Sequence, residues 1–345
     1  MKEFLHILSL RKTLTQEQAE QAMHLMMQGE ADPEHMAGLL MGLRTRGETL
    51  DELTGFTRVM REYAVHVECD DPHAIDLCGT GGDSSGTFNI STAAAFVCAG
   101  AGVTVAKHGN RSVSSKCGSA DVLAALGVNI ELHKRGVEHC LHEAGIAFIF
   151  APFFHPAMRF VMPIRRALGV RTFFNILGPL CNPARVRRQI VGTFSPLVAE
   201  LMAGILANLD AEHVITLHAD DGLDEISPAA ATKAFEHKAD RADQAASPRS
   251  FTIQPEDHRI QRTPLSALQG GDAEENAGIL HALFAGTLGP HRDVVILNAA
   301  YALHTSDRFD SLDACFDAAR ESIDSGRASA SLARLVEASN SAPAD

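Results

Sequence analysis

The chain has 345 residues, of which 46% are hydrophobic and 21% are charged, the balance of a globular protein with one large domain or two ordinary ones. This composition excludes a disordered, collagenous or coiled-coil chain. Acidic residues outnumber basic ones by 43 to 30, and the resulting net charge of −13 argues against a broad basic face that binds nucleic acid.

Residues 1–70 have the pattern of helices alone. Two capping boxes and one cap followed by a first-turn proline mark the helix starts: Thr15 with Gln18, Thr49 with Glu52, and Asp32 with Pro33. Methionine and leucine recur at helical spacing behind these starts. We therefore predict a small helical domain over residues 1–70, completed by helices near residues 155–185.

From residue 74 onward, short runs rich in Val and Ile alternate with helical patterns. The predicted strands are Ala74–Cys78, Val103–Ala106, Ala147–Phe150, Arg188–Phe194 and Val214–His218. The predicted helices between them include Ser91–Ala99, Ser119–Leu126 and Pro196–Leu209. Such alternation predicts βαβ units and an α/β domain over residues 71–345 with a mainly parallel central sheet. The polar stretch Lys238–Arg249 predicts an exposed loop without a function.

Seven cysteines without a Cys-x-x-Cys pair indicate buried thiols of a reducing compartment. Residues 1–18 already contain acidic and polar side chains, so we expect no signal peptide. The longest apolar run, residues 91–106, is interrupted by Ser, Thr and Gly and falls short of the roughly 20 residues of a membrane span. We therefore expect a cytoplasmic protein without membrane contact.

Two segments that follow predicted strands have the composition of anion sites. Residues 79–83, Gly-Thr-Gly-Gly-Asp, place three glycines within four residues, which lets backbone amides approach phosphate oxygens. Neither the dinucleotide fingerprint nor the P-loop matches this spacing. Residues 89–92, Asn-Ile-Ser-Thr, open a helix, so the hydroxyl of Ser91 or Thr92 and the first-turn amides predict a second anion site.

A third segment, residues 107–119, contains three cations, an amide and four serines, and its Ser119 is placed to cap the next helix. This density of donors favours anion binding over a solvated basic loop. A fourth segment, residues 220–225, is acidic and ends in Asp224 and Glu225. Neighbouring carboxylates repel one another unless a cation or protons intervene, and hard oxygen ligands suit Mg²⁺. A solvated acidic turn is the alternative for this run.

Two other patterns do not indicate a site. His133, His139, Cys140 and His142 have a spacing that metal ligands share, but no further partner set accompanies them, and we interpret the segment as a surface helix. The Gly-x-Ser-x-Gly motif of serine hydrolases is absent from the sequence.

The four segments together, with further motifs at residues 155–158, 171–180, 270–276 and 298–300, closely resemble the anthranilate phosphoribosyltransferase family of tryptophan biosynthesis. The resemblance covers nearly the whole chain. It implies transfer of the phosphoribosyl group of phosphoribosyl pyrophosphate to the amine of anthranilate, which is the second step of tryptophan synthesis from chorismate. It also implies a fold like that of class II nucleoside phosphorylases, and a homodimer formed through the helical domain.

The same resemblance assigns roles to individual residues. Those implied to bind phosphoribosyl pyrophosphate are Gly79, Gly82, Asp83, Thr87, Asn89, Ile90, Ser91, Thr92, Lys107, His108, Gly109, Asn110, Arg111, Ser112, Val113, Ser114, Ser115 and Ser119. Those implied to hold Mg²⁺ are Ser91, Asp224 and Glu225, and those implied to contact anthranilate are Gly79, Asn110 and Arg165. No residue is assigned as a general base.

Two alternatives stand beside this interpretation. A pyrimidine nucleoside phosphorylase would share the fold, but Gly109-Asn110-Arg111 after Lys107-His108, together with the Asp224-Glu225 pair, favours a pyrophosphate donor with magnesium. A non-catalytic relative that binds nucleic acid is the second alternative, and the net charge of −13 opposes it.

Overall fold

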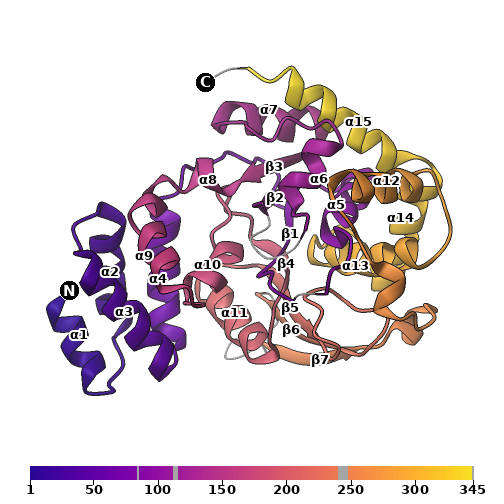
Figure 1. Ribbon diagram of the computed structural model, residues 1–345. Coiled ribbons are helices and arrows are strands. Elements are labelled where there is room, and N and C mark those ends of the chain that lie inside the picture. The colour runs from indigo at the N-terminus through magenta and orange to yellow at the C-terminus, as the bar shows by residue number, and fades with distance from the viewer. Residues whose placement is uncertain (84, 112–115, 240–247, 344–345) are drawn as a thin grey trace.

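The computed structural model describes residues 1–83, 85–111, 116–239 and 248–343. A group of helices at the N-terminal end stands beside a larger part built around one β-sheet (Figure 1). The N-terminus lies in the helical group, whereas the last helix, α15 (Arg327–Asn340), lies in the larger part.

The helical group begins with α1 (Lys2–Ser9), α2 (Gln16–Gln28), α3 (Pro33–Arg46) and α4 (Leu50–Glu62). Both predicted capping boxes are present at Thr15 and Thr49. Asp32 is the N-cap residue of α3, although its side chain pairs with His35 at 3.0 Å and makes no capping hydrogen bond. The predicted helix starts are therefore confirmed.

The sheet has seven strands in the order β3-β2-β1-β4-β5-β6-β7. The parallel strands are β1 (Ile75–Gly79), β2 (Val105–Gly109), β3 (Ile146–Phe150), β4 (Arg188–Gly192) and β5 (His213–Ala219). Two antiparallel strands, β6 (Thr232–Lys238) and β7 (Arg249–Ile253), extend the β5 edge. The mainly parallel sheet is therefore confirmed.

The prediction of a loop over Lys238–Arg249 is wrong at both ends. Lys238 is the last residue of β6 and Arg249 is the first residue of β7, while residues 240–247 lie outside the described part of the chain. Polar and charged side chains interrupt both sequences, TKAFEHK in β6 and RSFTI in β7, so they lack the apolar run that identified the buried parallel strands.

Helices cover both faces of the sheet. The remaining α-helices are α5 (Ile90–Gly100), α6 (Ser119–Ala125), α7 (Lys134–Ala144), α8 (Ala151–Phe154), α9 (Met162–Leu168), α10 (Phe174–Leu180), α11 (Pro196–Asn208), α12 (Ala273–Phe284), α13 (Pro290–Thr305) and α14 (Leu312–Asp324). Short 3-10 helices occupy Pro156–Phe160, Pro255–His258 and Leu265–Leu268. No helix among the described residues is long and apolar enough to cross a membrane.

Two hydrophobic cores lie on opposite faces of the sheet. Ile190 and Ile215 belong to the larger core, which contains α5 and α13, whereas Val191 and Val214 belong to the core that α1–α4 share with α9–α11. Successive side chains of a strand point to opposite faces, so β4 and β5 contribute to both cores. Phe56 of α4 stacks on Phe173, the N-cap residue of α10, at 4.4 Å between ring centroids, which packs α4 against the start of α10.

The cysteines do not form disulfides. All seven are free thiols, five buried and two half-buried. This arrangement agrees with the interpretation of the cysteines as packing residues rather than a disulfide framework.

Candidate active site

Predicted site segments lie directly after the carboxyl ends of parallel strands, on one side of the sheet. β1 ends at Gly79, β2 at Gly109, β4 at Gly192 and β5 at Ala219, and all four strands run in parallel. Open parallel sheets bind their ligands at the carboxyl ends of the strands. The topology therefore brings the glycine-rich loop, the basic loop and the acidic loop to one side of the molecule.

The glycine-rich loop after β1 depends on glycine conformations. Gly81 and Gly82 have φ values of 65° and 79°, in the left-handed region that side chains disfavour. Gly79 is constrained in another way, because a Cβ atom there would lie 2.8 Å from Oδ2 of Asp224. The loop can therefore approach a ligand and the acidic loop closely only with these glycines.

Asp224 and Glu225 join the acidic loop to both predicted anion sites. Asp224 Oδ2 accepts a hydrogen bond from the Gly81 amide at 2.9 Å. Glu225 Oε1 accepts one from the Ser91 amide at 3.1 Å, in the first turn of α5. Two carboxylates from one loop thus contact both predicted anion sites, the glycine-rich loop and the start of α5. The spacing of these residues along the sequence does not reveal this relationship.

Both carboxylates have raised pKa values. Burial, followed by the nearby charge of Asp83, raises the pKa of Asp224 to about 7. Burial, followed by the charge of Asp224, raises the pKa of Glu225 to about 8. Asp224 and Glu225 are each half-buried. A divalent cation bound there would relieve the repulsion, and carboxylate oxygens beside the Ser91 hydroxyl are donors that Mg²⁺ accepts.

Lys107 lies beneath this site rather than in the basic loop. Its side chain is buried, and Nζ donates to the Leu77 carbonyl at 2.5 Å and to Ser91 Oγ at 3.3 Å. Its positive charge lowers the pKa of Glu225 and so opposes the effect of burial. Lys107 therefore favours the ionised form of the carboxylate that a cation requires.

His108 is also an internal residue. Its Nε2 lies 3.3 Å from Nε2 of His155, and both rings are buried. Burial, and next the charge of His155, lowers the pKa of His108 to about 3, and burial lowers the pKa of His155 to about 4. Both imidazoles are therefore neutral near pH 7, and His108 adds no positive charge to the site.

The exposed part of the basic segment begins after β2. Asn110 and Arg111 are exposed, and Arg111 pairs with Asp121 of α6 at 3.0 Å. The predicted contacts of Ser112, Val113, Ser114 and Ser115 lie outside the described residues.

Ser119 does not cap α6, and that prediction is wrong. Gly118 is the N-cap residue and Ser119 is the first helical residue, because the Asp121 carboxylate reaches back to the Gly118 amide at 2.9 Å. Ser119 still lies at the site edge, since a Cβ atom on Gly109 would lie 3.5 Å from the Cβ of Ser119.

Asn89 links the start of α5 to more distant segments. Its Nδ2 donates to the Cys117 carbonyl at 3.3 Å, and its Oδ1 accepts from Asn276 Nδ2 at 3.0 Å. Asn276 Oδ1 in turn accepts from the Gly271 amide at 2.8 Å. The motif at residues 270–276 therefore supports the anion site that begins at Asn89.

The other predicted residues near α5 occupy distinct positions. Asp83 is half-buried and lies close enough to raise the pKa of Asp224. Thr87 bridges to Gln269, and Ile90 is a buried core residue at the start of α5. The Thr92 hydroxyl is buried and has no hydrogen-bond partner among the described residues.

Sequence reasoning assigned no role to three residues that shape the site. Asn298 Oδ1 accepts from the Ile226 amide at 2.9 Å and its Nδ2 donates to the Ile226 carbonyl at 3.0 Å, directly after Glu225. Arg171 Nη2 donates to the Gly82 carbonyl at 2.8 Å. Gly192 lies against the backbone of Asp224. The motifs at 171–180 and 298–300 signalled two of them, whereas nothing in the sequence singled out Gly192.

Arg165, the predicted anthranilate contact, lies in α9 within the helical group. Its guanidinium lies over the Phe174 ring at 5.4 Å from the centroid and is half-buried, and burial lowers its pKa. Its neighbour Arg166 is exposed. The structure thus distinguishes the two arginines, which the sequence alone left equivalent.

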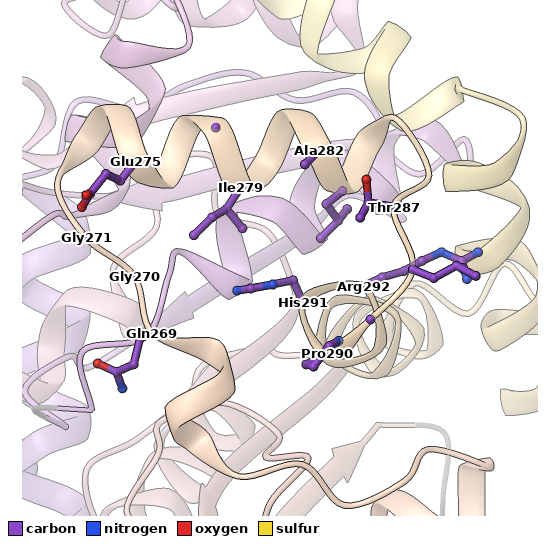
Figure 2. A pocket seen from close by; sticks show the side chains of 14 residues that line it. Gln269, Gly270, Gly271, Glu275, Ile279, Ala282, Thr287, Pro290, His291 and Arg292 are labelled. Atoms are coloured by element: carbon purple, nitrogen blue, oxygen red, sulfur yellow. The ribbon is translucent and has the colours of Figure 1, made fainter.

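A cavity at α12 and α13 does not coincide with this site. About 610 Å³ lies between α12 and the start of α13, lined by apolar side chains such as Ile279 and Leu283 and by His291 (Figure 2). None of the predicted site residues lines it. Gln269 and Gly271 connect the two regions, because both line the cavity, while Gln269 donates to the Ser85 carbonyl at 3.2 Å and the Gly271 amide donates to Asn276, which contacts Asn89.

Comparison with known proteins gives one family over almost the whole chain. Residues 2–64 match the helical bundle domain of a glycosyl transferase family, and residues 71–329 match its α/β domain. The chain is 65% identical to anthranilate phosphoribosyltransferase of Salinibacter ruber over 96% of each chain. It is 49% identical to that of Herpetosiphon aurantiacus, again over 96% of each chain.

Solved structures agree with the sequence relatives. The crystal structure of anthranilate phosphoribosyltransferase from Thermus thermophilus superposes with a TM-score of 0.90 at 39% identity, covering 98% of this chain and 99% of that one. The Saccharomyces cerevisiae enzyme in complex with phosphoribosyl pyrophosphate and Mg superposes with a TM-score of 0.86 at 26% identity, covering 95% and 94%.

Proposed function

Because the chain belongs to the anthranilate phosphoribosyltransferase family, we propose that it transfers the phosphoribosyl group of phosphoribosyl pyrophosphate to the amine of anthranilate, releasing pyrophosphate. The observation that carries this proposal is the Asp224–Glu225 pair, which accepts hydrogen bonds from the glycine-rich loop and from the first turn of α5. A cation site and two phosphate-type segments thus meet in one place, as a pyrophosphate donor requires.

Asp224, Glu225 and the Ser91 hydroxyl are the residues we propose to hold Mg²⁺. The donor set is made of hard oxygens, and the raised pKa values of the two carboxylates favour a bound cation over two bare charges. When bound, magnesium supplies charge stabilisation to the departing pyrophosphate. Lys107 and Asn298 act as positioning residues, the first by its charge near Glu225 and the second by holding Ile226.

The remaining contribution of the chain is orientation and electrostatics. Departure of pyrophosphate places negative charge on the leaving group, and backbone amides of the glycine-rich loop and the first turn of α5 would stabilise it. The aromatic amine of anthranilate is already a nucleophile, so positioning it against the ribose supplies much of the remaining rate. We assign no general base.

The acceptor end of the proposed site lies toward the helical group. Arg165 would pair its guanidinium with the anthranilate carboxylate, and Asn110 and Gly79 would line the path to the ribose. The placement of Arg165 on Phe174 supports this role, because the ring holds the guanidinium in one orientation.

The reaction gives a direct test of the proposal. Anthranilate is fluorescent, and its fluorescence should fall when protein, phosphoribosyl pyrophosphate and Mg²⁺ are mixed, but not when any one of them is omitted. Unchanged fluorescence with the complete mixture would contradict the proposal. Phosphate-dependent cleavage of a pyrimidine nucleoside would instead support the phosphorylase alternative, and a salt-sensitive gel shift would support nucleic-acid binding.

We further propose a division near residue 70, a homodimer formed through the helical group, and a cytoplasmic location. Two large apolar side chains of the helical group, Leu10 and Met41, are exposed in the single chain and would be covered by a second copy. The free thiols support a reducing compartment.

A further inference from the structure

A second cluster of side chains that can bind a metal ion lies at the amino-terminal end of β5, opposite the end of the sheet that carries the candidate active site. His213 is the first residue of β5, Glu236 lies near the end of β6, and His304 lies in the last turn of α13. The strand β5 separates His213 from Ala219 by six residue steps, or about 20 Å at ~3.3 Å per residue. The cluster is therefore remote from Asp224 and Glu225.

The three side chains converge on one point. Nε2 of His213 lies 3.1 Å from Oε1 of Glu236, and Nε2 of His304 lies 3.4 Å from the same oxygen. All three ligand atoms lie within 4.8 Å of one another. At metal–ligand distances of about 2.0–2.2 Å, a tetrahedral centre separates its ligand atoms by about 3.3–3.6 Å. The separation of 3.4 Å lies within this range and that of 3.1 Å lies just below it, so shifts of a few tenths of an ångström would seat a single ion.

A further carboxylate orients one of the imidazoles. Nδ1 of His213 lies 2.9 Å from Asp307, and Asp307 is itself held by Arg188 and by Lys238 at 2.5 Å. A His213 Nδ1–H that donates to Asp307 leaves Nε2 as the ring atom that faces Glu236. Metal-binding histidines have this arrangement, with one ring nitrogen on the metal and the other on a carboxylate.

The 3.1 Å between Nε2 of His213 and Oε1 of Glu236 is the length of a hydrogen bond, so a proton lies between the two atoms when no cation is bound, and a cation that binds both atoms replaces that proton. His213 is fully buried and Glu236 nearly so, so a ligand to both atoms is shielded from water. Glu236 Oε1 faces Nε2 atoms of two different rings, which are nitrogen donors of the kind that zinc prefers and magnesium does not.

We propose that His213, Glu236 and His304 bind a divalent transition-metal ion of the zinc class, with a water molecule in the fourth position. The ion joins β5, β6 and the end of α13, three segments distant in the sequence, and acts as a structural clamp at the edge opposite the active site. The proposal does not depend on the reaction that the chain catalyses.

The test measures zinc binding by a variant in which the two carboxylates of the candidate active site are replaced. Protein with Asp224→Asn and Glu225→Gln is purified without a metal-affinity tag, treated with chelator, dialysed and titrated with Zn²⁺ by calorimetry. We expect one equivalent to bind, and adding His304→Gln to weaken that binding at least tenfold. His142→Gln is the matched control, because the His142 side chain is 84% exposed and pairs only with its neighbour Glu143 in the described structure.

A zinc affinity that His304→Gln changes less than tenfold, or no binding of one equivalent, would overturn the proposal. X-ray absorption at the zinc edge keeps the test decisive if the His304 variant fails to fold. We expect two imidazole ligands at about 2.0–2.1 Å from zinc in the parent protein. A spectrum without two imidazoles would likewise overturn the site.

Discussion

The last residue of β4, Gly192, lies so close to the main chain of Asp224 that a Cβ atom at Gly192 would lie 1.5 Å from the Asp224 carbonyl oxygen. The backbone of Gly192 does not need a left-handed conformation, so contact alone excludes a side chain. The absence of one methyl group at the end of β4 therefore sets the position of the acidic loop, and with it the position of both carboxylates.

Gly192→Ala should displace the acidic loop and reduce kcat by about 100-fold, the loss typical of a misplacement of roughly 1 Å at a reacting centre. Gly278→Ala is the matched control, since a Cβ atom on Gly278 within α12 meets nothing within 4 Å. Steady-state kinetics and circular dichroism of both variants check the prediction. Activity of Gly192→Ala within twofold of the wild type would contradict it.

Asp224→Asn should raise the Mg²⁺ concentration needed for half-maximal activity by about ten- to hundredfold, because it removes a charged ligand worth about 1.5–3 kcal/mol. Asp220→Asn provides the control, since Asp220 is an exposed acid of the same loop. Activity is measured over a Mg²⁺ titration, with excess chelator as the zero point. Full activity of the wild type in chelator would show that no divalent cation is required.

Without a cation, the contribution of Asp224 and Glu225 to stability, measured as wild type against the double variant Asp224→Asn, Glu225→Gln, should fall as pH rises from about 4 to about 8. The ordinary pKa values of these carboxyls are 3.8 and 4.5, whereas folding raises that of Asp224 to about 7 and that of Glu225 to about 8. Between these limits the two carboxyls bind more protons in the folded chain than in the unfolded chain, so their contribution to the free energy of unfolding decreases with pH.

Mg²⁺ binds the ionised carboxylates and should therefore raise Tm more at pH 8.5 than at pH 6. The double variant Asp224→Asn, Glu225→Gln removes both titrations and should show little Mg²⁺-dependent shift at either pH. Thermal unfolding at the two pH values, with and without Mg²⁺, measures both effects. Equal Mg²⁺ shifts at pH 6 and pH 8.5 in the wild type would refute the assignment.

Arg165→Ala should raise the KM for anthranilate by about ten- to hundredfold, the worth of a charge-assisted hydrogen bond of about 1.5–3 kcal/mol. The KM for phosphoribosyl pyrophosphate should stay nearly unchanged, because we propose that other loops bind its phosphates. Arg166→Ala is the control, as the exposed neighbour on the same helix. Equal losses for both substrates would place the acceptor pocket elsewhere.

Light scattering at micromolar concentration should give twice the mass of one chain. Leu10→Glu with Met41→Glu places charge on the exposed apolar side chains of the helical group, 53% and 37% accessible, and should yield a monomer. Leu288→Glu changes a side chain that is 78% accessible outside the helical group and should leave the dimer intact. A wild-type monomer would disprove the homodimer.

Local patterns predicted most of the fold. The parallel strands were identified by short runs rich in Val and Ile, and the capping boxes at Thr15 and Thr49 located helix starts. The strands β6 and β7 were missed because each owes its conformation to the strand beside it, β5 for β6 and β6 for β7. The cap of α6 was predicted at Ser119, one residue beyond the true cap Gly118, because the Asp121 side chain bonds the Gly118 amide.

The sequence by itself determined the α/β class and, through combined motifs, the family, and it predicted the two anion-site segments and the acidic pair. Each of these depends on residues close together in the chain, because their spacing decides which local structure they form. Only the tertiary structure decided that Asp224 meets Gly81, that Glu225 meets Ser91, that Asn298 holds Ile226, and that His213, Glu236 and His304 converge. These contacts join segments far apart in the sequence, and the order of strands in the sheet, which brings such segments together, is not written in any local pattern.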